Sequence, residues 1–381
     1  MRVLFTTIPL SGHFFPLVPL AWACRLAGHE VLVATAESFV PTAARSGLPV
    51  VACGAAADGL DAVFAQARGH ELAERRYAHG QGFASVASQA MPGMAAVVDS
   101  WRPDLVVSER AELAGPFAAA ERGIPFVELH WAVAELAEYR AAAVDALGTL
   151  PVASGVLNPW PPSLRTPYSA GHWSMRNVDY NGDARVPAWA LRAAARPRVC
   201  VTFGTVLPQL FVDDAFELVG PVLESLARLD VEIVVAVDEK VAAGWPRLPD
   251  AVRHVGRLPL SEVLRACDLA VHHGGQGTTL SALGAGLPQV VLPAFDDQFD
   301  NGAAVVRAGA GICLPLAALT PTAVGDHCGR LLATPRHAEA ATRVADEIFA
   351  QRRPADVVTA LTRLASALRE STLEEVGQPP L

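Results

Sequence analysis

The sequence lacks any grouping of its cysteines. The six cysteines are scattered, with no Cys-x-x-Cys pair and no regular spacing. We therefore expect neither a zinc site nor a disulfide framework, and a reducing cytoplasm is the favoured location. No Asp-x-Asp triplet occurs in the sequence either, so the usual acidic clamp for a divalent cation is not expected. We predict no metal site.

Basic charge is also scarce. The chain carries 30 Lys and Arg against 39 Asp and Glu, a net charge of −9. Because binding to a phosphate backbone needs clustered basic side chains, we expect no nucleic acid partner. With 381 residues, of which 51% are hydrophobic and 18% charged, the composition is typical of a well-buried soluble protein with two domains.

The N-terminal segment has few charges, yet it does not match an export signal. Between Arg2 and Arg25 the only side chain that can carry a charge is His13. Three prolines and a glycine interrupt this stretch, whereas a signal peptide needs a continuous apolar helix. A strand, a loop and a new helix explain it better. We expect no export and no membrane span.

Short apolar strands alternate with helices along the chain, for example at Val3–Thr7, Glu30–Thr35 and Pro125–Leu129. This order is typical of parallel sheets covered by helices on both faces. The predicted fold class is α/β, with two Rossmann-like, doubly wound parallel-sheet domains that face a central cleft. Residues 146–187 are expected to form a loop. The predicted divisions are an N-terminal domain at 1–187, a linker at 188–197, a C-terminal domain at 198–353 and a helix at 354–381 that packs back toward the first domain.

A glycine-rich turn in the second domain predicts a phosphate site. It joins a strand at Leu269–Val271 to a helix at Thr278–Gly286. Such a turn exposes backbone N–H groups at the positive end of the helix dipole. A Gly-Thr turn after the strand at 199–203 can add further N–H groups and a hydroxyl. The alternative is a tight connection around a core histidine. The predicted diphosphate ligands are Gly204, Thr205, His273, Gly275, Gly277 and Thr278.

An acidic and amide cluster follows the next strand, Gln289–Leu292. Asp297 and Gln298 therefore lie at the edge of the sheet where open α/β sheets bind ligands. Their acceptor and donor groups suit adjacent sugar hydroxyls, although such a run also serves as a solvated loop or a helix cap. A diphosphate beside a hydroxyl-rich group suggests a nucleotide sugar. The neighbouring His272 and His273 point to opposite faces of their strand, so they do not converge on a metal ion.

His13 lies in the first strand-to-helix loop of the first domain and is expected to face the cleft. An imidazole there suits a general base near neutral pH, although a lone loop histidine is usually inert. A base of this kind needs a carboxylate to orient it. Glu109 and Glu135, each just beyond a predicted strand, are the two candidates.

Three segments together resemble the antibiotic glycosyltransferases of actinobacteria, which modify macrolides and polyketides and have the two-domain GT-B fold. The resemblance covers essentially the whole chain. It implies an inverting, metal-independent transfer of a deoxysugar from a dTDP-sugar to a polyketide, macrolide or aromatic acceptor, with no cofactor. The segments are SGHFFPLVPLAWACRLAGHEV at 11–31, VTFGT at 201–205 and DLAVHHGGQGTTLSALGAGLPQVVLPAFDDQFDNGAAVV at 268–306.

The resemblance also implies roles for single residues. His13 would remove the acceptor proton, with Glu109 as its acidic partner. Gln276, where the family often has serine, would join the diphosphate turn. Arg257, where the family often has tryptophan, and Leu258 would contact the nucleobase. The acceptor would lie in the first domain against Phe14, Phe15 and Trp131, for each of which core packing is the alternative.

Three other functions fit the same residues. One is C-glycosyl transfer to an aromatic polyketide, and another is a nucleotide-sugar 2-epimerase. The third is a non-catalytic auxiliary homologue that activates a partner transferase, but such a helper would need neither the base nor the donor turn. A homodimer is left open.

Overall fold

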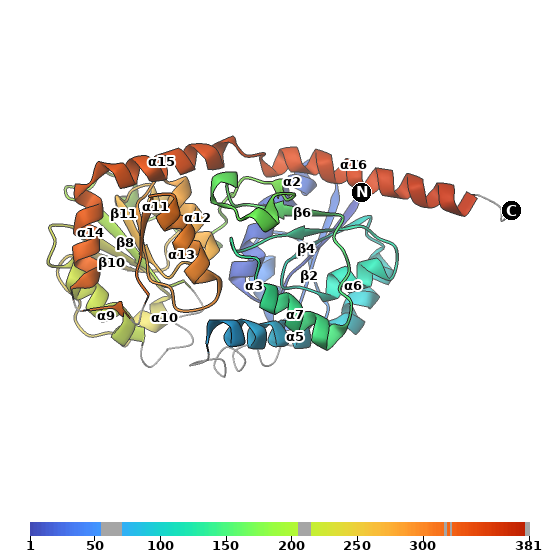
Figure 1. Cartoon of the computed structure of the whole chain (residues 1–381), viewed down its shortest axis with the longest axis horizontal. Helices are drawn as coiled ribbons and strands as arrows, with labels where there is room; N and C mark the ends of the chain where they lie inside the picture. The colour runs from blue at the N-terminus through green and yellow to red at the C-terminus, as the bar shows by residue number, and fades with distance from the viewer. Residues whose placement is uncertain (55–70, 205–214, 316–317, 321, 378–381) are drawn as a thin grey trace.

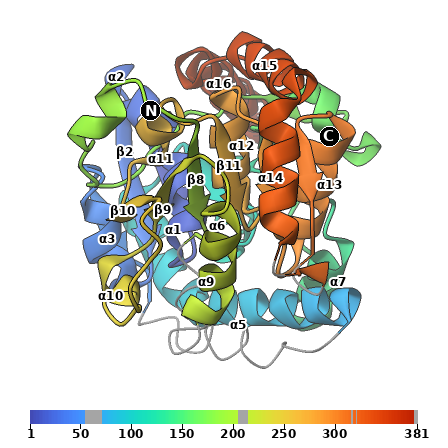
Figure 2. The ribbon, with the colours of Figure 1, turned by 90° about the vertical axis from the view of Figure 1, so that its left-hand side faces the viewer.

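A computed structural model describes residues 1–54, 71–204, 215–315, 318–320 and 322–377. Two parallel sheets lie side by side, each with helices on both faces (Figure 1). Viewed along the perpendicular direction, α15 and α16 run along one side of the molecule and α5 along the opposite side (Figure 2).

The N-terminal sheet has the strand order β3-β2-β1-β4-β5-β6-β7. All its strand pairs are parallel. Its elements are β1 (Arg2–Thr6), α1 (Ser11–Phe14), η1 (Phe15–Leu17), α2 (Val18–Leu26), β2 (Glu30–Thr35), η2 (Glu37–Phe39), α3 (Val40–Ala44), β3 (Val50–Ala52), α5 (Leu72–Trp101), β4 (Leu105–Glu109), α6 (Ala114–Ala120), β5 (Phe126–Leu129), α7 (Ala137–Leu147), β6 (Gly155–Asn158), η3 (Pro162–Leu164), η4 (Pro167–Ser169) and β7 (Trp173–Ser174).

The prediction of loop over 146–187 is wrong in part, because this segment supplies β6 and β7. The two strands have four and two residues, which is too short to show a periodic apolar pattern. The Trp173 ring lies against Gly155, where a Cβ atom would be 2.8 Å from it. This contact requires glycine and extends the sheet beyond β5.

The C-terminal sheet has the strand order β10-β9-β8-β11-β12-β13, again parallel. A short helix, η5 (Ala188–Leu191), precedes it. Its elements are β8 (Arg198–Thr202), α9 (Ala215–Leu226), β9 (Glu232–Ala236), α10 (Glu239–Ala242), β10 (Val252–Gly256), α11 (Leu260–Leu264), β11 (Leu269–His272), α12 (Gln276–Gly284), β12 (Gln289–Val291), α13 (Asp297–Arg307), β13 (Gly311–Cys313), α14 (Ala323–Ala333), α15 (Pro335–Ala350) and α16 (Pro354–Gly377).

Each sheet has its own apolar core. The central strands β1 and β4 are almost continuously buried, as expected for parallel strands covered on both faces. Five of the six cysteines are buried and none is paired. Among the described residues no helix has the length and apolar character that crossing a membrane requires.

Two contacts tie the domains together away from the cleft. α16 packs on α2 of the N-terminal domain, and Val357 and Leu361 join the core around β1 (Figure 1). In the other direction, Trp160 of the N-terminal domain is fully buried among C-terminal residues such as Leu280 and Ile348.

Candidate active site

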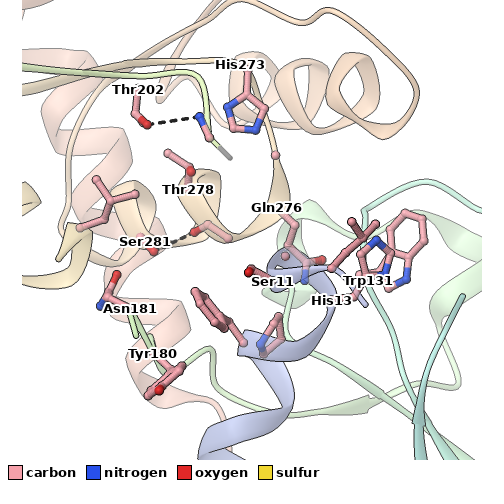
Figure 3. Close-up of a pocket in the computed structure, with 18 of the residues that line it drawn as sticks. Ser11, His13, Trp131, Tyr180, Asn181, Thr202, His273, Gln276, Thr278 and Ser281 are labelled. Atoms are coloured by element: carbon pink, nitrogen blue, oxygen red, sulfur yellow. Dashed lines mark hydrogen bonds between the residues drawn. The ribbon is translucent and has the colours of Figure 1, made fainter. Parts of the chain in front are cut away.

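A cavity of about 660 Å³ lies between the carboxyl ends of the two sheets. Its lining comes from the loop after β1, the turn between β11 and α12, the start of α13 and the segment 177–181. Figure 3 shows His13 and Trp131 together at one end, Tyr180 and Asn181 at the other, and the α12 turn between them. The cavity therefore occupies the edge where open α/β sheets bind ligands.

His13 and Glu109 form a hydrogen-bonded pair in this cavity. β1 and β4 are neighbours in register, with Thr6 opposite Ser108, so the loop after β1 meets the last residue of β4. The His13 Nδ1 and Glu109 Oε2 atoms are 2.9 Å apart. When Nδ1 donates to the carboxylate, Nε2 is left as an acceptor.

Glu109 is itself rigidly held. Its side chain is 1% exposed, against 17% for His13. Oε2 also accepts from the Ala111 amide at 2.8 Å and from the Trp131 indole at 3.0 Å, and Oε1 accepts from the Ile8 amide at 3.3 Å. The backbone carbonyl of Glu135 accepts a hydrogen bond from Arg110. Of the two predicted carboxylate partners, Glu109 is therefore the one that contacts His13.

The glycine-rich turn presents the N-terminus of α12 to the cavity. Gly275 is the N-cap residue, so Gln276, Gly277 and Thr278 form the first turn of the helix, and all of them line the cavity. The helix begins two residues before the predicted start. Amides in a first turn have no partner within the helix and are free to bind an anion.

The His273 ring lies between Gly204 and Gly275. A Cβ atom would lie 2.6 Å from His273 Cε1 if added to Gly204, and 2.5 Å from Nε2 if added to Gly275. Burial, and then the neighbouring His272, lower the pKa of His273 to about 3. Within the described residues its Nδ1 is buried and has no hydrogen-bond partner. The ring is thus neutral. Thr205, predicted to contact the diphosphate, lies outside the described residues.

His272, in contrast, makes its hydrogen bonds within the C-terminal domain. Its Nε2 pairs with Gln289 Oε1 at 2.7 Å, and its Nδ1 accepts from the Gly274 amide at 3.0 Å. The rings of His272 and His273 are 6.5 Å apart and nearly perpendicular. Within the described parts of the chain, no group of three or more His, Cys, Asp or Glu side chains is arranged to hold a metal ion.

The Gln276 side chain joins the two domains, and its predicted contact with the diphosphate stays a prediction. Its Oε1 accepts from the Ala132 amide and from the Trp160 indole, both at 2.7 Å. Asn301 makes a parallel contact, because its Oδ1 accepts from the Val133 amide at 3.1 Å. These side chains join α12 and α13 to the first domain. The backbone amide of Gln276, in the first turn of α12, stays available to an anion.

Asp297 and Gln298 occupy the first turn of α13 and line the cavity. Asn301 Nδ2 donates to Asp297 Oδ2 at 2.7 Å. Burial, and then the neighbouring Asp296, raise the pKa of Asp297 to about 7. Gln298 Oε1 accepts from the Ala294 amide at 2.9 Å, which orients its side chain. The two polar groups are therefore fixed beside the turn between β11 and α12.

The residue before them, Asp296, was not singled out by the sequence. Its backbone has φ 50° and ψ −118°, a region that favours glycine and costs about 1–3 kcal/mol for other residues. The side chain is buried and ion-paired with Arg75 Nε at 3.2 Å. It also accepts hydrogen bonds from His79 and Tyr139. No local pattern in the sequence announces such a conformation.

The predicted nucleobase residues lie at the far end of the cavity. Arg257 pairs with Asp183 at 3.5 Å, and Leu258 is largely buried but reaches the lining. Phe15 also lines the cavity, with its ring edge-to-face on Tyr180 at 5.1 Å. A Cβ on Gly182 would lie close to both Phe15 and Arg257. Phe15 therefore lies beside the nucleobase residues.

Of the other two predicted acceptor residues, one lines the cavity and the other does not. Phe14 is fully buried in the first core and packs on Phe39, so its assignment to the acceptor is wrong. Trp131 does line the cavity, with its ring 5.0 Å from that of His13. Phe83 and Tyr139 complete this aromatic wall. They lie on helices α5 and α7, where aromatic residues are ordinarily part of a core.

Comparison with known proteins assigns the family. The family described as erythromycin biosynthesis protein CIII-like matches residues 22–204 with its N-terminal domain and 220–364 with its C-terminal domain. The chain belongs to this family. It is a glycosyltransferase with the GT-B fold.

Among curated relatives, the L-demethylnoviosyl transferase of Streptomyces niveus is 39% identical, over 94% of this chain and 97% of its own length. The 3-alpha-mycarosylerythronolide B desosaminyl transferase of Saccharopolyspora erythraea is 31% identical, over 97% of this chain and all of its own length. Among solved structures, the glycosyltransferase SsfS6 of Streptomyces sp. SF2575 with thymidine diphosphate has a TM-score of 0.82 at 32% identity, covering 95% of this chain and 99% of that one.

Proposed function

We propose that this glycosyltransferase moves a deoxysugar from a dTDP-sugar to the hydroxyl of a polyketide, macrolide or aromatic acceptor, with inversion and without a metal ion. The observation that carries the proposal is that the His13–Glu109 pair and the α12 turn line the same cavity. The relatives support the substrate classes: several are named as transferases of deoxysugars, and one structural neighbour contains thymidine diphosphate.

The donor would lie along the C-terminal wall. The amides of Gly277 and Thr278 and the His273 ring would bind the diphosphate, since a helix N-terminus favours negative charge. His273 Nδ1, which has no partner in the described part of the chain, would donate to a phosphate oxygen. Asp297 and Gln298 would bind sugar hydroxyls, and Arg257 and Leu258 would flank the nucleobase. This arrangement places the anomeric carbon toward the end of the cavity that contains His13.

The acceptor would enter at the aromatic wall of Trp131 and Phe83. His13 Nε2 would take the hydroxyl proton as the oxygen attacks the anomeric carbon from the face opposite the diphosphate. That single displacement inverts the anomeric configuration. Glu109 would stabilise the imidazolium that forms, and the helix dipole would stabilise the departing diphosphate.

The test is to incubate the full chain with dTDP-deoxysugars and hydroxylated polyketides, with and without EDTA. We expect a product heavier by one sugar, of inverted anomeric configuration by NMR, at the same rate in EDTA. Retention of configuration or loss of turnover in EDTA would contradict the mechanism. A glycosidic bond that resists acid would indicate C-glycosyl transfer instead, and an isomerised donor without acceptor would indicate an epimerase.

The location and assembly of the protein stay predictions. We expect a cytoplasmic enzyme, on the pattern of its cysteines, with a small-molecule donor and a hydrophobic acceptor as its partners. The proposed domain limits at 187 and 198 can be tested by limited proteolysis. The homodimer can be tested by light scattering of the purified chain.

A further inference from the structure

Asp296 is held almost entirely by the other domain. It belongs to the C-terminal domain, yet Arg75 and His79 of α5 and Tyr139 of α7 contact its carboxylate. Arg76 adds a hydrogen bond of 2.9 Å to its backbone carbonyl. Four groups from two N-terminal helices thus converge on one buried residue.

These contacts account for the unusual backbone conformation of Asp296. A non-glycine residue with φ 50° persists only where its surroundings over-determine it. Here no side-chain cap from the residue itself stabilises α13, so the partners across the interface are what hold the carboxylate. Although burial alone would raise the pKa of Asp296, the hydrogen bond from His79 and the contacts of Tyr139 and Arg75 lower it. The anchor is therefore a charged carboxylate.

The position of Asp296 connects this anchor to both halves of the cavity. The next residues, Asp297 and Gln298, begin α13 and line the cavity. On the other side, the Tyr139 ring contacts those of Phe83 and Trp131, at 5.4 and 5.9 Å. These are the rings that flank His13.

We propose that Asp296 is a positioning residue: docking of its carboxylate on α5 and α7 places the Asp297–Gln298 turn, and with it the donor sugar, in register with His13. The inference rests on the proposed function for the identity of the donor. The diphosphate and nucleobase residues lie on other segments: after β8, in the turn between β11 and α12, and on the β10–α11 connection. Loss of the anchor should therefore affect the sugar and the transfer step while binding of the nucleotide continues.

Two substitutions distinguish the effect of the Asp296 side-chain contacts from that of its backbone conformation. Asp296→Asn keeps the shape and removes the charge. Asp296→Gly adopts the same backbone freely but removes every side-chain contact. If backbone geometry alone placed the turn, the glycine variant would transfer sugar as wild type does. We expect transfer to be impaired in both variants.

The matched control is Asp300→Asn. Asp300 lies one turn further along α13 and pairs with Arg76 across the same interface, but its side chain is 39% exposed and its backbone is helical. The Asp300 carboxylate is far more exposed than that of Asp296, so loss of its charge should cost less. We expect transfer rates within about threefold of wild type for this control.

The experiment measures dTDP and dTDP-L-rhamnose binding by calorimetry, and kcat and KM for transfer, with the full chain. For both Asp296 variants we expect dTDP affinity within about twofold of wild type and kcat lower by about 10²-fold, the scale of a small misplacement of reacting groups. Unchanged kcat, or dTDP binding lost in parallel with transfer, would overturn the proposal.

A ligand-free measurement keeps the inference separate from the proposed function. Hydrogen exchange of residues 294–298 should be at least about tenfold faster in Asp296→Asn than in wild type or Asp300→Asn, with the melting profile still cooperative. Equal exchange in all the proteins would overturn the anchor whatever the donor proves to be. If hydrogen exchange is faster in Asp296→Asn but wild type transfers no sugar from any dTDP donor, the proposed function is contradicted, whereas the role of Asp296 in holding the turn is supported.

Discussion

The two histidines that line the cavity have opposite surroundings. His13, in the short helix α1 that follows β1, faces a carboxylate at 2.9 Å. His273, in the turn after β11, lies between two glycines, and burial lowers its pKa to about 3. Both follow a central strand of a parallel sheet. The same side chain at equivalent places in two Rossmann-like domains therefore has a carboxylate partner in one and a buried, neutral ring in the other, which suits the proton transfer and the neutral hydrogen bond that we propose.

The difference shows what sets the role of a histidine in such a loop. Where the neighbouring strand ends in glutamate, as β4 does at Glu109, the ring gains a partner that fixes its tautomer. Where the neighbouring strand ends at a Gly204 turn, as β8 does, the ring is desolvated and stays neutral. Four substitutions test this comparison.

Replacing His13 should have the largest effect. His13→Ala removes the base, so kcat should fall by about 10²–10⁴-fold. Binding of dTDP should stay within about twofold of wild type, because none of the predicted diphosphate ligands is on α1. Steady-state transfer and calorimetry on the same preparation measure both. Turnover that survives the change would remove His13 from the mechanism.

Replacing Glu109, the partner of His13, should lower kcat less than replacing His13 itself. Glu109→Gln keeps the hydrogen-bonding shape but loses the charge that stabilises the imidazolium, and we expect a loss of kcat of about 10²-fold. The matched control is Glu135→Gln, the other carboxylate that the sequence offered, which should leave kcat within about twofold. Reversal of the two results would mean that Glu135 is the partner in the working enzyme.

On the donor side, Gly275→Ala should weaken nucleotide binding. The new Cβ would lie 2.5 Å from His273 Nε2, so the ring or the turn must move, at a cost of about 1–3 kcal/mol. We expect dTDP affinity to fall about tenfold, which corresponds to about 1.4 kcal/mol. Gly284→Ala, at the other end of α12 with no atom within 4 Å of the added Cβ, should bind dTDP as wild type does.

The smallest effect should appear in stability at high pH. The folded pKa of Asp297, about 7, lies above its ordinary value of 3.8, so the folded state binds the extra proton between these values. Its contribution therefore destabilises the fold as pH rises from about 4 to 7. Asp297→Asn should raise the unfolding free energy by about 1 kcal/mol at pH 8 and leave it unchanged near pH 3. Melting curves at the two pH values measure this; a gain that is equal at both would contradict it.

Much of the cavity could be predicted because it depends on chain order. A parallel α/β sheet brings the residues after each strand to one edge, so His13, Glu109, Asp297 and the α12 turn could be placed together from strand positions alone. The residues alone left Glu109 and Glu135 open, since both follow predicted strands; in the structure Glu109 ends β4 and contacts His13.

What could not be predicted depends on contacts between the domains. The Gln276 side chain turns to Ala132 and Trp160, more than a hundred residues away in sequence. Asp296 takes a conformation suited to glycine because of helices α5 and α7. Phe14 and Phe15 are adjacent in sequence, yet one is buried in the core and the other reaches the cavity. Local pattern carries no signal for any of these.

The most direct test of the division between the two histidines is calorimetric titration of dTDP into His13→Ala and His273→Ala, side by side in EDTA. We predict that His13→Ala binds dTDP as wild type does, whereas His273→Ala binds it at least about tenfold more weakly. Equal affinity in the two variants, or weaker binding by His13→Ala, would contradict the account.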